Sequence, residues 1–254
     1  TPLFTHIPGL KVVCPSTPYD TKGLLIQSIR DNDPVIFLEH KNLYGFEGEV
    51  PEASYAIPFG EAQVVREGKT VSIVTYGLMV HRALAAAEIL EREHGISCTV
   101  VDVRSLVPLD TVTILAEVAK TGRLVTIEEN PRLCGWGAEI ASIVADEIFW
   151  DLDGPIVRVT TPHIPLSAAN NLEDLQLPSP ERIVETPAGM LNAIGLQGIG
   201  VRRFVAEKLP ELRRRNVTVV VNVCGTSVDE YAEVTRILSD AEGVHGIVPP
   251  RRAR

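Results

Sequence analysis

The chain has 254 residues, of which 45% are hydrophobic and 22% are charged, as expected for a globular protein with one large domain or two small ones. A net charge of −9 argues against non-specific binding to nucleic acid, which needs clustered lysine and arginine. No apolar run approaches the length that spans a bilayer, and the first ten residues lack the basic start and apolar core of a signal peptide. We therefore expect a cytoplasmic protein that binds neither nucleic acid nor membranes.

The first part of the chain predicts a strand–helix–strand unit. An apolar strand is expected over residues 10–16, a helix with apolar residues at helical spacing over 20–30, and a second strand over 35–40. Two strands joined through a helix favour parallel pairing. Residues 45–60 are rich in glycine, proline and polar side chains, so we predict an exposed linker there.

The next part, residues 69–160, alternates regularly between strands and helices. Apolar strands are expected over 70–77, 97–106, 123–130 and 155–162, and helices over 81–95, 109–122 and 135–149. Gly95 and Gly122 would end the first two of these helices. The order predicts a mostly parallel sheet covered by helices, with right-handed crossovers.

A change of pattern follows this region. Residues 161–182 contain four prolines and predict a surface tail. Beyond residue 186 a new α/β pattern begins, with a helix expected over 201–215, a strand over 217–225 and a helix over 228–240. No internal repeat links the two halves.

Two glycines, Gly135 and Gly137, stand at a predicted helix start after a strand. Free backbone N–H groups at such a start can hold a phosphate. The spacing is not the G-x-G-x-x-G of dinucleotide-binding proteins, and the glycines follow the third strand of the unit rather than the first. We favour close packing of the helix start over phosphate binding.

Charged residues at predicted strand ends give no catalytic constellation. Arg104 and Asp110 flank a turn, where they could face a ligand, but Asp110 can equally cap the next helix, and we favour this structural role. Glu128 and Glu129 are adjacent on a strand, so their side chains point to opposite faces and cannot act as a pair. The six histidines are scattered, without a local nucleophile or metal-ligand pattern.

The four cysteines form no C-x-x-C pair and have no histidine at metal-finger spacing. Free cysteines of cytosolic proteins are usually buried and reduced. We expect this state for the set, which is Cys14, Cys98, Cys134 and Cys224.

The loop SIRDND, residues 28–33, combines the carbonyls of a helix C-terminus with Asp31 and Asp33. Carbonyl oxygens at a helix end carry partial negative charge and suit a hard cation. A solvated turn explains the same residues, and the sequence alone favours that interpretation.

Several long stretches resemble one family. FTHIPGLKVVCPSTPYDTKGLLIQSIRDNDPVIFLEHKNLYG resembles the middle of the beta subunit of the decarboxylating component of 2-oxo-acid dehydrogenase complexes. EHKNLYGFEGEVPEASYAIPFGEAQVVREG and MVHRALAAAEIL are most similar to the acetoin dehydrogenase branch. The resemblance continues through VDVRSLVPLD, TGRLVTIEEN, GWGAEI and TPHIPLSAANNLEDLQLPSPERIVE, and so covers about residues 1–185.

The resemblance implies a fold and a set of partners. Residues 59–185 would form a transketolase C-terminal-like domain, a mostly parallel sheet with helices on both faces, and residues 1–58 the end of the thiamine-binding pyrimidine domain. Thiamine diphosphate would belong to the full complex and not be bound by this chain alone, because the family's cofactor-activating residues lie upstream of Thr1. The implied partners are the alpha subunit, a second beta subunit and the dihydrolipoamide acyltransferase core. No catalytic residue is expected in this chain.

The same resemblance gives the SIRDND loop a metal. The family's potassium site uses the matching loop, so the implied ligands are the carbonyls of Ser28, Ile29 and Asp31 together with Asp33.

The tail resembles a second family. RIVETPAGMLNAIGLQ and VTVVVNVCGTSVDEYAEV are similar to flavin-dependent dihydroorotate dehydrogenases of the heterodimeric bacterial type, so residues 186–254 would be a small α/β fragment of a TIM barrel. The resemblance places Asn222 at the flavin and assigns a substrate loop to Asn192, Ala193, Ile194, Gly195 and Leu196. The loop that carries that family's catalytic cysteine has no counterpart, since the chain continues into GIVPPRRAR. We therefore expect neither flavin binding nor dehydrogenase activity from this fragment.

The resulting hypothesis is an enzyme subunit, part of the beta chain of an acetoin or 2-oxo-acid dehydrogenase that serves mainly as scaffold and subunit interface. The complex would perform oxidative cleavage with acyl transfer to lipoamide, and this chain alone would be inactive. Two alternatives stay open: a non-catalytic dimerisation or docking module, and a flavin-dependent dihydroorotate dehydrogenase fragment.

Overall fold

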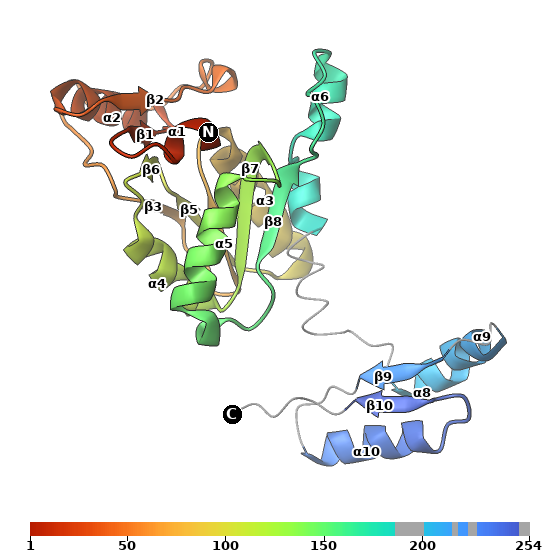
Figure 1. Cartoon of the computed structure of the whole chain (residues 1–254). Coiled ribbons are helices and arrows are strands. Elements are labelled where there is room, and N and C mark those ends of the chain that lie inside the picture. The colour runs from red at the N-terminus through yellow and green to blue at the C-terminus, as the bar shows by residue number, and fades with distance from the viewer. Residues whose placement is uncertain (186–200, 215–217, 223–227, 249–254) are drawn as a thin grey trace. The chain divides into compact units, whose positions relative to one another are not determined.

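The chain folds into two compact units, Thr1–Met190 and Leu191–Arg254, in the computed structural model shown in Figure 1. The structure describes residues 1–185, 201–214, 218–222 and 228–248. Within this part of the chain, no helix is long and apolar enough to cross a membrane.

The larger unit is built on a five-stranded sheet with the order β3-β5-β4-β7-β8. Its strands are β3 (Gln63–Arg66), β4 (Val71–Thr75), β5 (Cys98–Asp102), β7 (Leu124–Pro131) and β8 (Val157–Thr161). β5, β4, β7 and β8 pair in parallel, and β3 is antiparallel to β5 at the edge. The prediction of a mostly parallel sheet is therefore confirmed.

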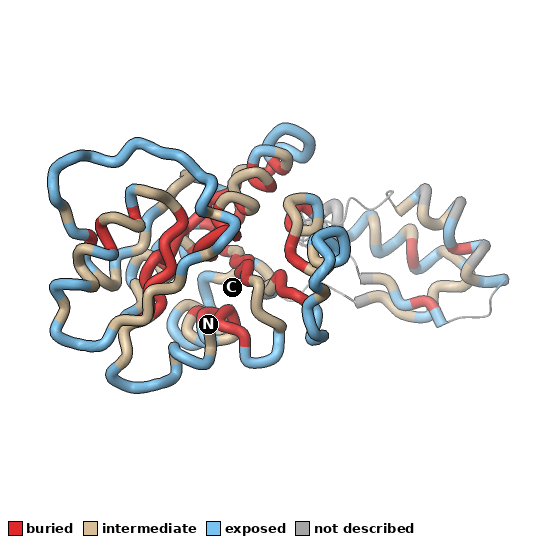
Figure 2. The backbone as a smooth tube through the Cα atoms, turned by 90° about the horizontal axis from the view of Figure 1, so that it is seen from above, coloured by how far each residue is buried: buried red, intermediate tan, exposed pale blue. Residues whose placement is uncertain are grey.

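Helices cover both faces of this sheet, as the resemblance implied (Figure 1). α3 (Leu78–His94) lies on one face, and α4 (Thr111–Thr121) and α5 (Trp136–Glu147) lie together on the other, followed by the short helix η2 (Phe149–Asp151). Figure 2 shows the buried backbone concentrated in the middle of this unit. The core on the α4–α5 side is an apolar cluster of strand and helix residues that includes Val74, Val101, Leu124, Ile114, Val118, Ile140 and Val144. Its burial supplies the main driving force for this layer.

The helix ends follow the local signals in the sequence. Asp110 accepts a hydrogen bond from the Thr113 amide at 3.0 Å and so caps α4, as predicted. Gly95 and Gly122 end α3 and α4 with φ values of +66° and +67°, in the left-handed region that favours glycine.

A second sheet of three strands has the order β2-β1-β6. β1 (Lys11–Val13), α2 (Pro18–Arg30) and β2 (Val35–Phe37) form the expected parallel strand–helix–strand unit, flanked by the short helices α1 (Pro2–Thr5) and η1 (Lys41–Leu43). The third strand, β6 (Ser105–Val107), pairs antiparallel with β1. The single strand predicted over residues 97–106 was wrong here, because Arg104 adopts φ +51° and separates β5 from β6.

The exposed linker predicted over residues 45–60 is wrong near its end. Ile57 is buried and packs with Val13 and Leu24, and its amide donates to the Gly23 carbonyl at 3.2 Å. A Cβ at Gly23 would lie 2.5 Å from Ile57 Cγ1, so α2 and this segment need glycine at their contact.

The surface tail predicted over residues 161–182 is also wrong in part. α6 (Asn170–Gln176) is exposed, but the helical residues 180–185 fold back onto the unit and bury Ile183 and Val184. Arg82 donates to the Pro178 carbonyl at 2.6 Å, and Arg182 donates to the Thr160 carbonyl at 2.7 Å. These contacts hold the returning segment against the unit, and the local sequence did not reveal them.

In the described residues of the smaller unit, β9 (Val220–Asn222) pairs in parallel with β10 (Gly246–Val248), and α10 (Val228–Ser239) joins them. Before it, α8 (Val201–Arg203), a π-helical stretch (Phe204–Lys208) and α9 (Leu209–Arg214) form the predicted helix. The irregular stretch precedes Pro210, which has no amide hydrogen to continue the regular pattern. A strand–helix–strand unit of this kind is the building block of a TIM barrel.

Replacing Ile183 by alanine tests the packing of the returning helix. The side chain is 0% exposed, so I183A should lower the free energy of unfolding of the first unit by about 3 kcal/mol through a lost apolar contact and a cavity. Leu175→Ala, on the exposed α6 at 80% exposure, is the matched control and should stay within about 0.5 kcal/mol. Equal urea-unfolding curves for the two variants would contradict the packed tail.

Candidate functional site

Polar and charged residues gather where the carboxyl ends of β5 and β7 meet the β1–α2 segment. Asp102 ends β5, and Glu128 and Glu129 lie toward the end of β7. Ser16 and Asp20 approach from the start of α2, and His40 from the segment after β2. Since ligands of open α/β sheets bind beyond the carboxyl ends of the strands, this edge is the candidate site.

Glu128 is fully buried and fills the start of α5. Its carboxylate accepts from the Gly137 amide at 2.9 Å, from Asn130 Nδ2 at 3.2 Å and from Arg158 Nη2 at 3.3 Å. A Cβ on Gly137 would lie 2.5 Å from Thr126 Oγ1, and one on Gly135 would lie 2.5 Å from Glu128 Oε1. The prediction of close helix packing at the two glycines is confirmed, because a carboxylate of the chain itself takes the place where a phosphate would bind.

Glu129 points away from Glu128, as predicted for neighbours on a strand, and pairs with His40 at 3.0 Å. The Asn42 amide donates to His40 Nδ1 at 3.2 Å, so Nε2 carries the proton that faces Glu129. The pair joins the segment after β2 to β7 and so links the two sheets.

Arg104 lies inside the protein and has a structural role. Its guanidinium donates to Asp20 Oδ1 at 3.0 Å and to the Glu61 carbonyl at 2.9 Å. Asp110, which flanks the same turn, caps α4 and accepts from the Ala62 amide at 2.9 Å. The structural interpretation of both residues is confirmed.

Asp102 is 0% exposed, and its partners are uncharged groups. Ser16 Oγ donates to one oxygen of its carboxylate, and the Arg104 backbone amide donates to the other at 3.1 Å. Burial raises the pKa of Asp102 to about 7, the Ser16 hydroxyl opposes this rise, and the nearby Asp20 carboxylate adds to it.

The SIRDND loop, residues 28–33, is contacted by a cation of the protein itself, Lys11 of β1. Its Nζ lies 2.7 Å and 2.8 Å from the two oxygens of Asp31 and 3.0 Å from Asp33. Hydrogen bonds with these carboxylates raise the pKa of Lys11, and the Lys11 ammonium lowers the pKa of Asp31. Ser28 and Ile29 lie in the last turn of α2, so their backbone carbonyls accept no hydrogen bond from within the helix. Sequence reasoning missed Lys11, which is 20 residues away from Asp31.

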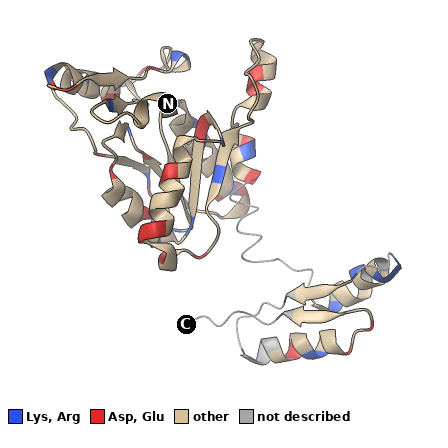
Figure 3. Cartoon of the chain, viewed as in Figure 1, with Lys and Arg blue, Asp and Glu red and all other residues tan. Residues whose placement is uncertain are grey.

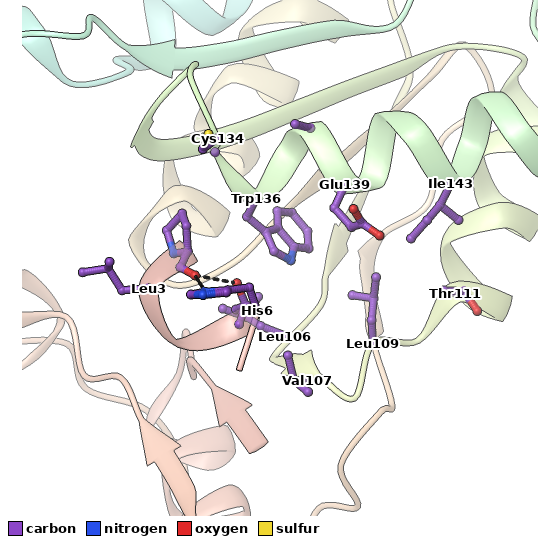
Figure 4. Close-up of a pocket in the computed structure, with 14 residues that line it drawn as sticks. Leu3, His6, Leu106, Val107, Leu109, Thr111, Cys134, Trp136, Glu139 and Ile143 are labelled. Atoms are coloured by element: carbon purple, nitrogen blue, oxygen red, sulfur yellow. Dashed lines mark hydrogen bonds between the residues drawn. The ribbon is translucent and has the colours of Figure 1, made fainter. Parts of the chain in front are cut away.

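Two cavities lie near these elements. One of about 790 Å³ is shown in Figure 4, with mostly apolar walls that include Leu3, Leu106, Leu109, Trp136 and Ile143. The other, of about 490 Å³, lies between α2 and the segment after β2. His6, in the larger cavity, bonds to the Pro2 carbonyl at 3.0 Å rather than to a nucleophile. Among the described residues, no group of three or more acidic, histidine or cysteine side chains could hold a metal ion.

The cysteine prediction holds for two residues and fails for one. Cys14 and Cys98 are buried and free, and burial raises the pKa of each thiol to about 12. Cys134 is exposed and lies at φ +54° in the turn that leads into α5. Cys224 lies outside the described residues.

The residues assigned by the second resemblance are not placed. The substrate loop, Asn192, Ala193, Ile194, Gly195 and Leu196, lies outside the described residues. Asn222 ends β9, and its side chain also lies outside the described part.

Three segments of the chain match protein-family models. Residues 60–183 match "Transketolase, C-terminal domain", residues 1–47 match "Transketolase, pyrimidine binding domain", and residues 176–247 match "Dihydroorotate dehydrogenase".

The curated relatives are beta subunits. The beta subunit of acetoin:2,6-dichlorophenolindophenol oxidoreductase from Cupriavidus necator is 63% identical over 183 residues, which are 72% of this chain and 54% of that protein. The corresponding Bacillus subtilis subunit is 50% identical over 74% of this chain and 55% of its own length. The beta subunit of the Bacillus subtilis pyruvate dehydrogenase E1 component is 49% identical over 74% of this chain and 58% of its length. The chain thus spans about half the length of the curated relatives it matches.

Solved structures agree with the fold. A split-gene transketolase in an inactive beta4 tetramer has a TM-score of 0.62 and 29% identity, covering 75% of this chain and 60% of that one. A transketolase from Pichia stipitis has a TM-score of 0.51 and 14% identity, covering 75% of this chain and 26% of that one, and so supports the fold alone. The chain has a transketolase C-terminal-like α/β fold. Its homologues are the beta subunits of acetoin and pyruvate dehydrogenases, components of thiamine-dependent 2-oxo-acid dehydrogenase complexes.

Replacing Glu128 by glutamine tests its structural role. E128Q should lower the free energy of unfolding by about 3 kcal/mol, because the guanidinium of Arg158 would lose its anionic partner inside the protein. The matched control is E129Q, whose half-buried pair with His40 should contribute less than about 1 kcal/mol. An E128Q variant as stable as E129Q in urea unfolding would refute this role.

Proposed function

We propose that the chain is the beta-subunit part of a thiamine-dependent acetoin or 2-oxo-acid dehydrogenase that acts in the cytoplasm by oxidative cleavage with acyl transfer to lipoamide. The observation that carries the proposal is the 63% identity with the acetoin oxidoreductase beta subunit over 183 residues. In such complexes the cofactor supplies the chemistry, and the protein binds and orients it.

The described residues do not form a site for thiamine diphosphate. A diphosphate with its magnesium ion needs free amide donors and a group of acidic ligands. The one glycine-rich helix start at the candidate site is occupied by Glu128, and the described part has no cluster of metal-ligating side chains. The role we propose for this chain is therefore scaffold and subunit interface, with the cofactor held elsewhere in the complex.

The partners we propose are an alpha subunit, a second beta subunit and the acyltransferase core. The end of α5 supports a partner-binding role, since Trp150 is 93% exposed beside Phe149, Asp146, Glu147 and Asp151. Figure 3 shows acidic residues at this end of α5. An exposed aromatic pair with acidic neighbours suits a basic protein surface with an apolar centre, which we assign to the acyltransferase.

Co-purification with an alpha subunit tests the proposal. A tagged alpha subunit of an acetoin dehydrogenase, co-expressed with this chain, should retain it, whereas the chain alone with thiamine diphosphate and magnesium should cleave no acetoin. The tag without the alpha subunit is the control. Failure to co-purify would favour the independent docking module, and acetoin cleavage by the chain alone would overturn the scaffold role.

The match of residues 176–247 to dihydroorotate dehydrogenase raises the question whether the smaller unit binds flavin. A TIM barrel closes eight strand–helix units around its core, whereas the described part of the smaller unit contains one parallel strand pair with its crossover helix. We therefore propose that this unit binds no flavin, and a yellow purified chain with stoichiometric flavin would contradict this.

For the loop of Ser28, Ile29, Asp31 and Asp33 we propose a weak potassium site. Lys11 already bonds to both carboxylates and offsets one of their two negative charges, so an ion would bind mainly to carbonyls. The melting temperature of the wild-type chain should differ by less than about 1 °C between potassium and sodium chloride, since stabilisation by a ligand grows with its concentration relative to Kd. Lys11→Gln frees the carboxylates and should enlarge the potassium-specific rise. A large potassium-specific rise in the wild type would show a strong site instead.

A further inference from the structure

The β1–α2 segment is fastened to the five-stranded sheet by contacts that converge on the end of β5. Ser16 donates to Asp102, and Asp20 accepts from Arg104 at 3.0 Å. The Cys14 amide donates to the Arg104 carbonyl at 2.8 Å. From α3, His81 Nε2 bonds to the Ser16 carbonyl at 2.8 Å. Two carboxylates and one guanidinium therefore lie in the seam between the two sheets.

The charges in this seam are unequal. Asp20 and Asp102 are 2% and 0% exposed, and the Arg104 guanidinium bonds to Asp20 but to no oxygen of Asp102. The other titratable groups that face the seam do not compensate Asp102. His81 bonds to a carbonyl, and the Cys14 thiol is held protonated by burial, with its pKa raised to about 12.

We propose that Asp102, Asp20 and Arg104 form a proton-controlled clamp that holds residues 11–30 on the five-stranded sheet. The clamp is closed when Asp102 carries a proton, because the buried cluster then has one negative and one positive charge. A protonated Asp102 can donate its O–H to Ser16 Oγ, while its other oxygen still accepts from the Arg104 amide. The proposal is independent of the dehydrogenase function.

Loss of the proton weakens the clamp. The carboxylate of Asp102 then adds an uncompensated charge beside Asp20 in a site without water contact. The pKa of Asp102 is raised in the folded protein to about 7, so the folded state holds a proton that the unfolded state has released. The stabilisation is therefore complete below the ordinary aspartate pKa, declines as the pH rises, and is lost above about pH 7.

Asp102→Asn tests the clamp in the full-length chain, because the amide imitates the protonated acid and cannot ionise. The melting temperatures of D102N and the wild type should agree near about pH 3.5, below the ordinary aspartate pKa, and D102N should melt about 10 °C higher near about pH 8. Hydrogen exchange at about pH 8 should be slower in D102N for residues 11–30, with β8 unchanged. The control is Asp153→Asn, because the Asp153 side chain is 65% exposed. This variant should follow the wild-type pH profile.

Ser16→Ala provides an independent test if D102N fails to fold. The Ser16 hydroxyl stabilises the ionised form of Asp102, so its removal should move the pH at which stability is lost to a higher value. A serine with a merely structural role would lower stability equally at every pH. The proposal is overturned if D102N has the same pH profile as D153N, or if S16A shifts stability without moving the pH of the transition.

Discussion

The reversal of the chain at Arg104 is the constraint on which the larger unit depends. Its left-handed backbone, φ +51°, ends β5 at Asp102 and starts β6 in the other sheet, so one peptide segment belongs to both layers. The guanidinium of the same residue donates to Asp20 on α2, and its carbonyl accepts from the Cys14 amide. Without this turn, the β1–α2 segment would have no third strand and no charged contact with the five-stranded sheet.

The polar residues at the carboxyl edge of the sheet bond to other groups of the same chain. Glu128 accepts a hydrogen bond from the first turn of α5. Glu129 pairs with His40, and Asp102 accepts a hydrogen bond from Ser16. An edge that binds ligands in many α/β proteins is here a joint between two domain types of one family. In the described part of the chain, the polar groups at this edge anchor α5 and the β1–α2 segment.

The two family matches overlap at residues 176–183, where the returning helix begins. The overlap includes residues that are structural in the first unit, since Leu177 and Ile183 are buried and Arg182 bonds to Thr160. The match to dihydroorotate dehydrogenase therefore begins within residues that pack in the first unit. The smaller unit keeps the parallel strand–helix–strand geometry of a barrel segment.

The sequence by itself determined the elements whose signals are local. Alternating apolar runs predicted the parallel strands and helices, Asp110 the cap of α4, and Gly95 and Gly122 the helix ends. The long matching stretches also identified the dehydrogenase family, because similarity over about 180 residues is specific where a short motif is not. Each of these inferences needs only residues that are near one another in the chain or a match along it.

Tertiary structure decided the rest. Ser16 and Asp102 are 86 positions apart, and Asp20 and Arg104 are 84 positions apart. No local sequence pattern predicts either contact. The same holds for Lys11 between Asp31 and Asp33, for β6, and for the burial of Ile57 and Ile183. Propensity and periodicity report on a few turns of chain, whereas the place of a buried charge is set by groups brought together only when the sheets pack.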